Sequence, residues 1–257
     1  MKKWNVYATR RILDPAIPII AQKCSIVLNN KARPPTRSEL LAGVRNKDAV
    51  FCTLSDKIDR KVMDAAGSSL KVISSYSTGV DHIDINEATK RGIHVTTTGD
   101  ILTEAVADLT FALLLATSRQ LAQGYEMVTQ KRWKLGWDPN LLLGSDVHGM
   151  TMGIFGMGRI GSAVARRAKG FNMHIIYHTR HGRNIQIDNE LGAKYVSMEQ
   201  LVEESDFLSL HSSLNSETYR LIDRSKLRKM KNAAYLINTA RGLLVNEQHL
   251  IEALRRK

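Results

Sequence analysis

The feature that most constrains this chain is the alternation of short, β-branched apolar runs with segments of helical periodicity. The runs are residues 5–9, 25–28, 49–53, 71–75, 93–97, 151–155, 174–177, 207–210 and 234–238. Alternation of strand and helix is typical of a parallel sheet wrapped by helices. We therefore predict the α/β fold class, and we expect the first five runs to be buried strands.

A break in this alternation divides the chain in two. Residues 103–124 form a long amphipathic stretch, with Thr103 as the expected N-cap, and residues 131–149 are irregular and rich in Trp, Gly and Pro. After this break a second alternating series begins. We expect two flavodoxin- or Rossmann-like domains with parallel sheets, at residues 1–100 and 101–257, and a cleft between them.

Composition excludes several classes of protein. Apolar residues make up 43% of the 257 residues and charged residues 24%, which is ordinary for a globular protein. The two cysteines, Cys24 and Cys52, cannot form a disulfide framework or, alone, a zinc site, so no metal is expected. No signal peptide and no bilayer-spanning apolar stretch is evident. The expected location is cytoplasmic, without membrane contact.

The net charge is strongly positive. Lys and Arg number 37 and Asp and Glu 25, which gives a formal charge of +12. The basic residues are spread along the chain, without a basic block or interleaved aromatics, so we do not expect a nucleic-acid partner. An anionic small substrate or a 2′-phosphorylated cofactor would also favour positive clefts.

The strongest local signal is the glycine motif Gly156-x-Gly158-x-x-Gly161. It follows an apolar run and opens an Ala-rich helical segment, which is the context that dinucleotide binding requires. Gly156 permits the tight turn, Gly158 lets a pyrophosphate approach the backbone, and Gly161 lets helix and strand pack closely. The helix N-terminus supplies N–H donors for the phosphates. This context favours a dinucleotide site over a turn that serves packing alone.

The end of the next strand indicates which dinucleotide is bound. An NAD site usually has an acidic residue there for the ribose 2′-hydroxyl, but residues 162–187 contain none. The segment holds Thr179, Arg180, His181, Gly182 and Arg183 instead. Arginine presents forked donors to phosphate oxygens, so the segment favours NADP(H). A solvated basic loop that also admits NAD(H) is the alternative.

Three further motifs, with the glycine motif, resemble the D-isomer specific 2-hydroxyacid dehydrogenase family. They are SSYSTGVDHID at residues 74–84, LTEAVADL at 102–109 and INTARGLLV at 237–245. Residues 133–139 and 143–146 resemble the glyoxylate/hydroxypyruvate reductase branch, and the resemblance covers the chain from about residue 5. It implies a substrate domain, a Rossmann cofactor domain, a homodimer built on the latter, and an oxidoreductase that reduces a small 2-oxo acid with NAD(P)H.

The resemblance also implies roles for individual residues. Arg241 matches the family's catalytic arginine, since a guanidinium can hold the carboxylate of a 2-oxo acid and polarise its carbonyl. A capping or surface arginine is the alternative. The implied substrate-binding residues are Leu54, Tyr76, Ser77, Thr78, Gly79 and Arg241. The implied cofactor-binding residues are Thr103, Gly156, Gly158, Arg159, Ile160, Gly161, Thr179, Arg180, His181, Gly182, Arg183, Thr239, Ala240 and Arg241.

The sequence departs from the family after Arg241. The family's acid/base histidine and the glutamate that orients it have no counterpart in these 257 residues, so we expect the last part of the family fold to be missing. Loss of a general acid lowers a rate by about 10²–10⁴. Among the eight histidines, His211 follows the run 207–210, at the strand ends where an α/β cleft forms, but the family has a histidine at this position that is not the acid/base. The alternative function is a catalytically impaired, dinucleotide-binding interaction or sensor protein of the same fold.

Overall fold

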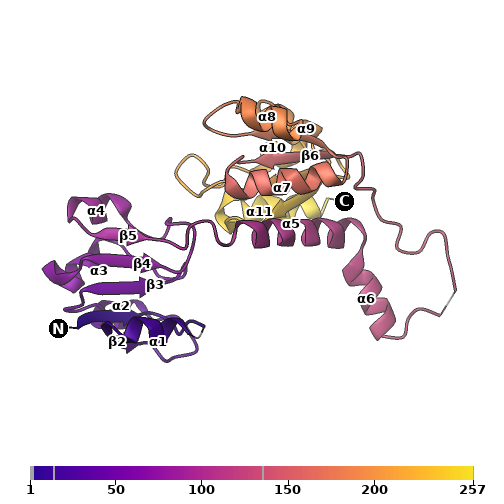
Figure 1. Cartoon of the computed structure of the whole chain (residues 1–257). Coiled ribbons are helices and arrows are strands. Elements are labelled where there is room, and N and C mark those ends of the chain that lie inside the picture. The colour runs from indigo at the N-terminus through magenta and orange to yellow at the C-terminus, as the bar shows by residue number, and fades with distance from the viewer. Residues whose placement is uncertain (1–2, 14, 135, 257) are drawn as a thin grey trace. The chain divides into compact units, whose positions relative to one another are not determined.

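The computed structural model describes residues 3–13, 15–134 and 136–256 (Figure 1). Contacts between residues divide the chain into two compact units, Met1–Leu102 and Thr103–Lys257. This division lies close to the domain boundary expected at residue 100. Each unit is an α/β structure with a parallel sheet, so the predicted fold class is confirmed.

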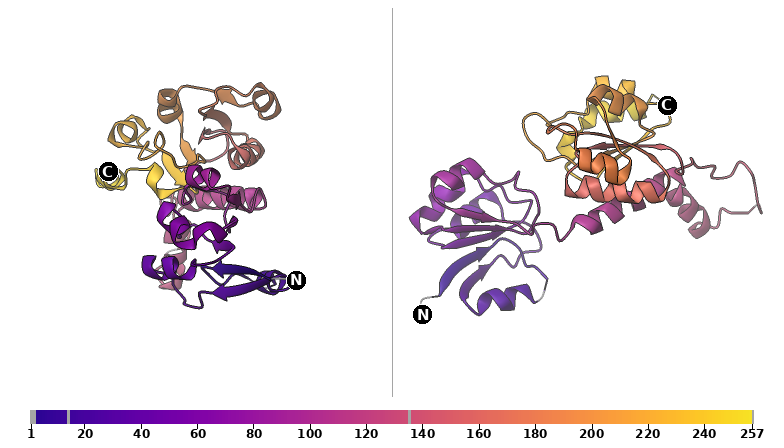
Figure 2. Two further views of the ribbon diagram at one scale, coloured as in Figure 1. Left: turned by 90° about the vertical axis from the view of Figure 1, so that its left-hand side faces the viewer. Right: turned by 45° about the horizontal axis from the view of Figure 1, so that its top comes forward.

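The first unit holds a five-stranded parallel sheet in the order β2-β1-β3-β4-β5. Its strands are β1 (Trp4–Ala8), β2 (Cys24–Leu28), β3 (Ala49–Cys52), β4 (Val72–Ser75) and β5 (His94–Thr96). Its α-helices are α1 (Ala16–Ala21), α2 (Arg37–Gly43), α3 (Arg60–Ala66) and α4 (Ile85–Lys90). All five predicted strands are present, and Figure 2 shows them from two further directions. The expectation that all five are buried is wrong, because β2 and β5 are edge strands and remain partly exposed.

The order of the strands in this sheet creates a crevice for a ligand. The chain runs from β1 to β2 on one side and then returns to β3 on the other side of β1. In an open α/β sheet, ligands bind outside the carboxyl ends of the strands where the order reverses in this way. The turns after β1 and β3 lie at that point.

The second unit holds another five-stranded parallel sheet, in the order β10-β9-β6-β7-β8. Its strands are β6 (Thr151–Phe155), β7 (His174–His178), β8 (Lys194–Tyr195), β9 (Phe207–Leu210) and β10 (Tyr235–Asn238). Its α-helices are α5 (Thr103–Ser118), α6 (Leu121–Thr129), α7 (Arg159–Gly170), α8 (Ile185–Leu191), α9 (Met198–Glu204), α10 (Arg224–Lys229) and α11 (Glu247–Leu254). The order reverses between β6 and β9, which places a second crevice at the carboxyl ends of these strands.

The stretch predicted as one helix over residues 103–124 is two helices in the structure. The first, α5, begins at Thr103 itself and ends at Ser118, and Gln120 is left-handed with φ +52°. The carbonyl of Ser118 accepts a hydrogen bond from the N–H of Ser145 at 2.9 Å, which the following segment supplies. Because this tertiary bond and the left-handed residue end the helix, apolar periodicity alone could not locate its end.

Among the helices of residues 3–13, 15–134 and 136–256, none has the length and apolar character needed to cross a membrane. Within the same residues, no group of three or more His, Cys, Asp or Glu side chains could hold a metal ion.

Candidate functional site

A cavity of about 400 Å³ lies in the second unit at the carboxyl ends of β6, β7 and β9. This is the crevice that the strand order predicts. The residues that line it come from the turns after these strands and from the segments that follow. They are Phe155, Gly156, Gly158, His178, Thr179, Arg180, His181, Met198, His211, Ser212, Ser213, Asn215, Glu217, Thr218 and Leu221.

The three glycines of the motif have three different surroundings. Gly156 has φ +98°, and a Cβ built on it would lie 2.8 Å from the carbonyl carbon of His211. A Cβ on Gly161 would lie 2.1 Å from the carbonyl oxygen of Gly156, so helix and turn are in direct contact there. A Cβ on Gly158, in contrast, would meet no described heavy atom within 4 Å. Gly156 and Gly161 are therefore required by the fold, whereas Gly158 borders open space.

The backbone of His211 packs against Gly156 in the glycine turn. Its Nε2 is 2.7 Å from the hydroxyl oxygen of Ser209, and burial lowers the pKa of His211 to about 4. The imidazole is therefore neutral at physiological pH and already hydrogen-bonded. A neutral imidazole whose Nε2 is already hydrogen-bonded is a poor proton donor at pH 7, so the geometry does not favour His211 as a general acid.

The predicted 2′-phosphate segment is only partly at the cavity. Thr179, Arg180 and His181 line it. Nη1 of Arg180 is 3.5 Å from Oε2 of Glu217, and both side chains are largely exposed. The guanidinium of Arg183 donates to the buried carboxylate of Asp188, with 2.5 Å between Nε and Oδ2. Arg183 is thus engaged in the structure of its own loop, and its predicted role with Gly182 in binding a cofactor stays a prediction.

Sequence reasoning missed Glu217. Its carboxylate lies in the same cavity as Arg180, but 37 residues separate the two in the chain, and nothing in the residues around Glu217 marks it as a ligand-binding position. Only the tertiary structure brings the segment after β9 against the turn after β7. An acidic side chain there opposes the binding of a phosphate, so the local electrostatics are less uniformly positive than the sequence indicates.

The segment that follows β10 is held rigidly. The side-chain oxygen of Asn238 accepts the N–H of Ala240 at 3.0 Å, and its Nδ2 donates to the carbonyl of Arg241 at 2.8 Å. The hydroxyl of Thr239 lies 3.0 Å from that of Thr110 on α5, which ties the segment to this helix. Nη1 of Arg241 also donates to the carbonyl of Ala240 at 3.0 Å. The predicted catalytic arginine therefore projects from a backbone that is fixed by side-chain hydrogen bonds.

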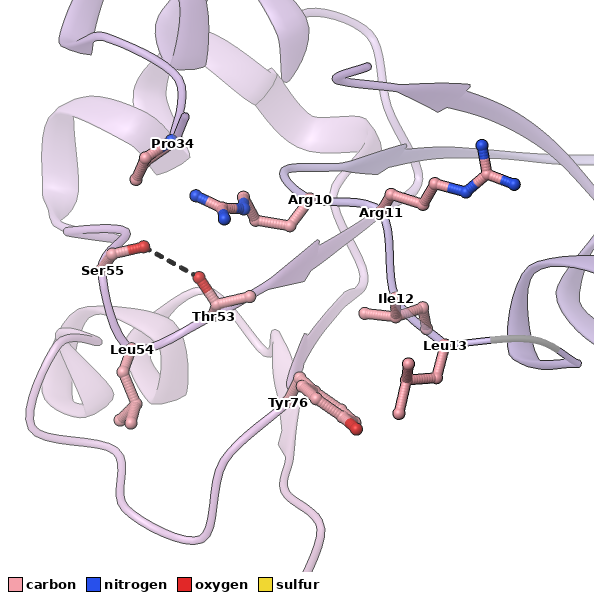
Figure 3. Close-up of a pocket in the computed structure, with 9 residues that line it drawn as sticks. All are labelled: Arg10, Arg11, Ile12, Leu13, Pro34, Thr53, Leu54, Ser55 and Tyr76. Atoms are coloured by element: carbon pink, nitrogen blue, oxygen red, sulfur yellow. Dashed lines mark hydrogen bonds between the residues drawn. The ribbon is translucent and has the colours of Figure 1, made fainter. Parts of the chain in front are cut away.

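A second cavity, of about 770 Å³, lies in the first unit and is shown in Figure 3. It lies at the other crevice, where the turns after β1 and β3 meet the turn after β4. Two of the predicted substrate residues, Leu54 and Tyr76, line it. The complete lining consists of Arg10, Arg11, Ile12, Leu13, Pro34, Thr53, Leu54, Ser55 and Tyr76.

The predicted substrate turn, Tyr76–Gly79, begins at this cavity. The N–H of Tyr76 donates to the carbonyl of Cys52 at 2.8 Å, which continues the pairing of β3 and β4. The N–H groups of Ser77, Thr78 and Gly79 find no acceptor among the residues that the structure describes. Side-chain hydrogen bonds fix this turn. The hydroxyl of Ser77 lies 2.7 Å from that of Ser75 and donates to the carbonyl of Gly79 at 2.6 Å. Consecutive free amides in a fixed turn suit an anion.

The sequence and the structure are both similar to those of known dehydrogenases and reductases. The sequence pattern of the NAD-binding domain of D-isomer specific 2-hydroxyacid dehydrogenases matches residues 111–257. The glyoxylate reductase of Thermococcus litoralis is 46% identical over 256 residues, which are 98% of this chain and 77% of that protein. The glyoxylate reductase of Korarchaeum cryptofilum is 44% identical over 253 residues, 98% of this chain and 76% of that protein. The crystal structure of the TT0316 protein from Thermus thermophilus superposes with a TM-score of 0.89 at 44% identity, covering 98% of this chain and 78% of that one.

Proposed function

The chain belongs to the D-isomer specific 2-hydroxyacid dehydrogenase family, and from this we propose that it reduces glyoxylate or hydroxypyruvate with NADPH. NAD(P)-dependent reduction of a 2-oxo acid to the 2-hydroxy acid is the reaction of the family. The choice of substrate rests on one observation, the identity of 41–46% to glyoxylate reductases over nearly the whole chain. Residues 1–100 are the proposed substrate domain and residues 101–257 the proposed cofactor domain.

The residues of the second unit fit a nicotinamide dinucleotide. The pyrophosphate is assigned to the glycine turn, where Gly158 borders open space and the twelve-residue helix α7 begins at Arg159. The free N–H groups and the positive dipole end of this helix favour an anion there. The remaining proposed contacts are Thr103, Gly156, Arg159, Ile160, Gly161, Thr179, Arg180, His181, Gly182, Arg183, Thr239, Ala240 and Arg241. When bound, the dinucleotide supplies the hydride.

The proposed substrate contacts come from three places. The free N–H groups of residues 77–79 hold the carboxylate, because successive amides in a turn form an anion-binding nest. Leu54 supplies an apolar wall of the cavity in the first unit. Arg241 binds the substrate and polarises its carbonyl, which draws electrons toward the oxygen and opens the carbon to hydride attack.

The direct test is oxidation of NADPH, followed at 340 nm with and without glyoxylate. We expect glyoxylate-dependent loss of absorbance, and the same with hydroxypyruvate. NADPH binding, measured by fluorescence, that is not followed by oxidation with either acid would contradict the proposed reaction. That result would support the alternative, a dinucleotide-binding sensor of the same fold.

The preference for NADPH is proposed from Arg180. Replacing this residue with Asp should lower the ratio of kcat/KM for NADPH to that for NADH by about 10- to 100-fold, because a charge-assisted hydrogen bond contributes about 1.5–3 kcal/mol. Glu217→Gln should change the ratio in the opposite direction, since it removes the carboxylate 3.5 Å from Arg180. The control is Arg45→Asp, which makes the same charge change at an exposed site in the other unit. An unchanged ratio in Arg180→Asp would mean that another residue reads the 2′-phosphate.

We also propose a homodimer built on the second unit. Figure 1 shows α6 and the segment after it extending away from the sheet of this unit. The large apolar side chains of α6 and of the segment after it are exposed, and so are those on one side of α5. Exposed apolar side chains that gather in this way mark an interaction surface. They are Leu109, Leu113, Leu121, Tyr125, Val128, Trp133, Trp137 and Leu143. Sedimentation should give about twice the chain mass of 28.8 kDa, and Tyr125→Glu should shift it toward the monomer. A wild-type mass of one chain at micromolar concentration would reject the dimer.

A further inference from the structure

The cavity of the first unit contains two arginines that the reduction of a two-carbon acid does not require. Arg10 and Arg11 come from the turn after β1, and they share the cavity with Leu54 and with Tyr76, the first residue of the proposed carboxylate turn. The cavity measures about 770 Å³, whereas glyoxylate has only five non-hydrogen atoms. The space therefore accommodates a longer molecule whose carboxylate lies at the turn.

Among the described residues that line the cavity, positive charges are not balanced by negative ones. Some cations elsewhere in this unit have carboxylate partners, for example Arg33 with Glu39 at 2.7 Å and Arg37 with Asp59 at 2.5 Å. Exposed ones such as Arg45 and Lys57 have none among the described residues. Arg10 and Arg11 have no carboxylate within 4 Å among the residues that the structure describes, and no acidic side chain is found in the described lining. An arginine left without a counter-ion beside a cavity attracts an anion.

The carboxylate of Asp56 does not supply the missing partner. It is buried, 2% exposed, and its Oδ2 already accepts three hydrogen bonds. These come from the hydroxyl of Thr9 at 2.5 Å and from the N–H and hydroxyl of Thr53 at 2.8 and 3.0 Å. Asp56 is thus satisfied by neutral donors below the cavity and serves to fix the turn after β3.

The two arginines have different orientations. In Figure 3 the guanidinium of Arg10 extends into the side of the cavity where Pro34, Thr53 and Ser55 lie, whereas that of Arg11 extends in the opposite direction. Arg10 is also half-buried and Arg11 is exposed. A partly desolvated guanidinium binds an anion more strongly than an exposed one, since water screens it less. Arg10 is therefore the residue that a ligand in this cavity would meet.

We propose that Arg10 forms a subsite for a second anionic group, so that the protein takes 2-oxo acids carrying a carboxylate or phosphate at their far end. This inference rests on the proposed function, because it places the 2-oxo acid carboxylate at the turn of residues 77–79. The chain of the ligand would cross the apolar wall that Leu13, Leu54 and Tyr76 provide. The forked guanidinium of Arg10 suits both carboxylate and phosphate oxygens.

The test compares matched pairs of ligands by calorimetry in the presence of NADP⁺, which prevents reduction during the measurement. One pair is 2-oxobutyrate and oxaloacetate, in which a carboxylate of oxaloacetate takes the place of the terminal methyl group of 2-oxobutyrate. The other is hydroxypyruvate and its 3-phosphate. We expect the doubly anionic member of each pair to bind about 10-fold more tightly or better, as one charge-assisted hydrogen bond predicts. Arg10→Met should abolish the difference.

Arg11→Met is the matched control, because it makes the same charge change in the same turn. It should keep the preference for the doubly anionic ligands, and melting curves should show that both variants fold. Equal binding within each wild-type pair, no binding of any ligand, or equal losses in the two variants would overturn the subsite. Glyoxylate-dependent oxidation of NADPH is measured separately. Turnover without the preference rejects only the subsite, and the preference without turnover rejects only the proposed function.

Discussion

Replacing Arg241 with methionine should lower kcat/KM for glyoxylate by about 10²- to 10³-fold, because it removes the donor proposed to stabilise charge on the carbonyl oxygen. The affinity for NADPH should fall by a much smaller factor, because Arg241 is only one of many proposed cofactor contacts. The side chain projects from a segment that Asn238 holds through bonds to the backbone of residues 240 and 241, so methionine leaves this framework intact. Steady-state kinetics and a fluorescence titration of NADPH separate the two effects.

Two further variants test whether the loss of kcat/KM is caused by removal of the guanidinium of Arg241. Arg241→Lys retains the charge but loses the fork, and we expect its activity to lie between wild type and Arg241→Met. Arg228→Met removes an exposed arginine from α10 and should leave kcat/KM unchanged. An Arg241→Met variant with wild-type kcat/KM would show that the resemblance has assigned the wrong arginine.

The strands could be predicted from the sequence because strands of parallel sheets are rich in β-branched and other apolar residues. All nine predicted runs are strands in the structure. The strand that was missed, β8 at Lys194–Tyr195, has two residues, too few to show any periodicity. Its identity depends on pairing with β7, through the register of Ile176 with Lys194, and such pairing is not written in local sequence.

The candidate site likewise has a part that the local sequence reveals and a part that only the folded structure reveals. The glycine turn could be found because its function requires a fixed spacing within six residues. The partners of the basic segment could not, because Glu217 and Asp188 reach Arg180 and Arg183 only after folding. Arg10 was missed for a related reason, since an arginine after a strand carries no signal until the cavity beside it and its missing counter-ion are seen.

The difference between the three glycines leads to the second large expected effect. Gly158→Val should fold normally and raise the dissociation constant for NADPH by about 100-fold or more. The free protein has no described atom within 4 Å of the added Cβ, and φ of −83° is open to any residue. The side chain would occupy the space assigned to the pyrophosphate, and losing two charge-assisted hydrogen bonds would cost about 3 kcal/mol or more.

Two other glycines give the comparison that makes this result specific. Gly170→Val, at the end of the same helix, also meets open space and should change neither the melting temperature nor NADPH affinity appreciably. Gly161→Val should lower the melting temperature, since its Cβ would lie 2.1 Å from the carbonyl of Gly156. Binding lost in Gly158→Val with stability retained places the phosphates over that residue. Wild-type binding in Gly158→Val would instead mean that the dinucleotide does not approach this turn, because valine cannot share the space with a pyrophosphate.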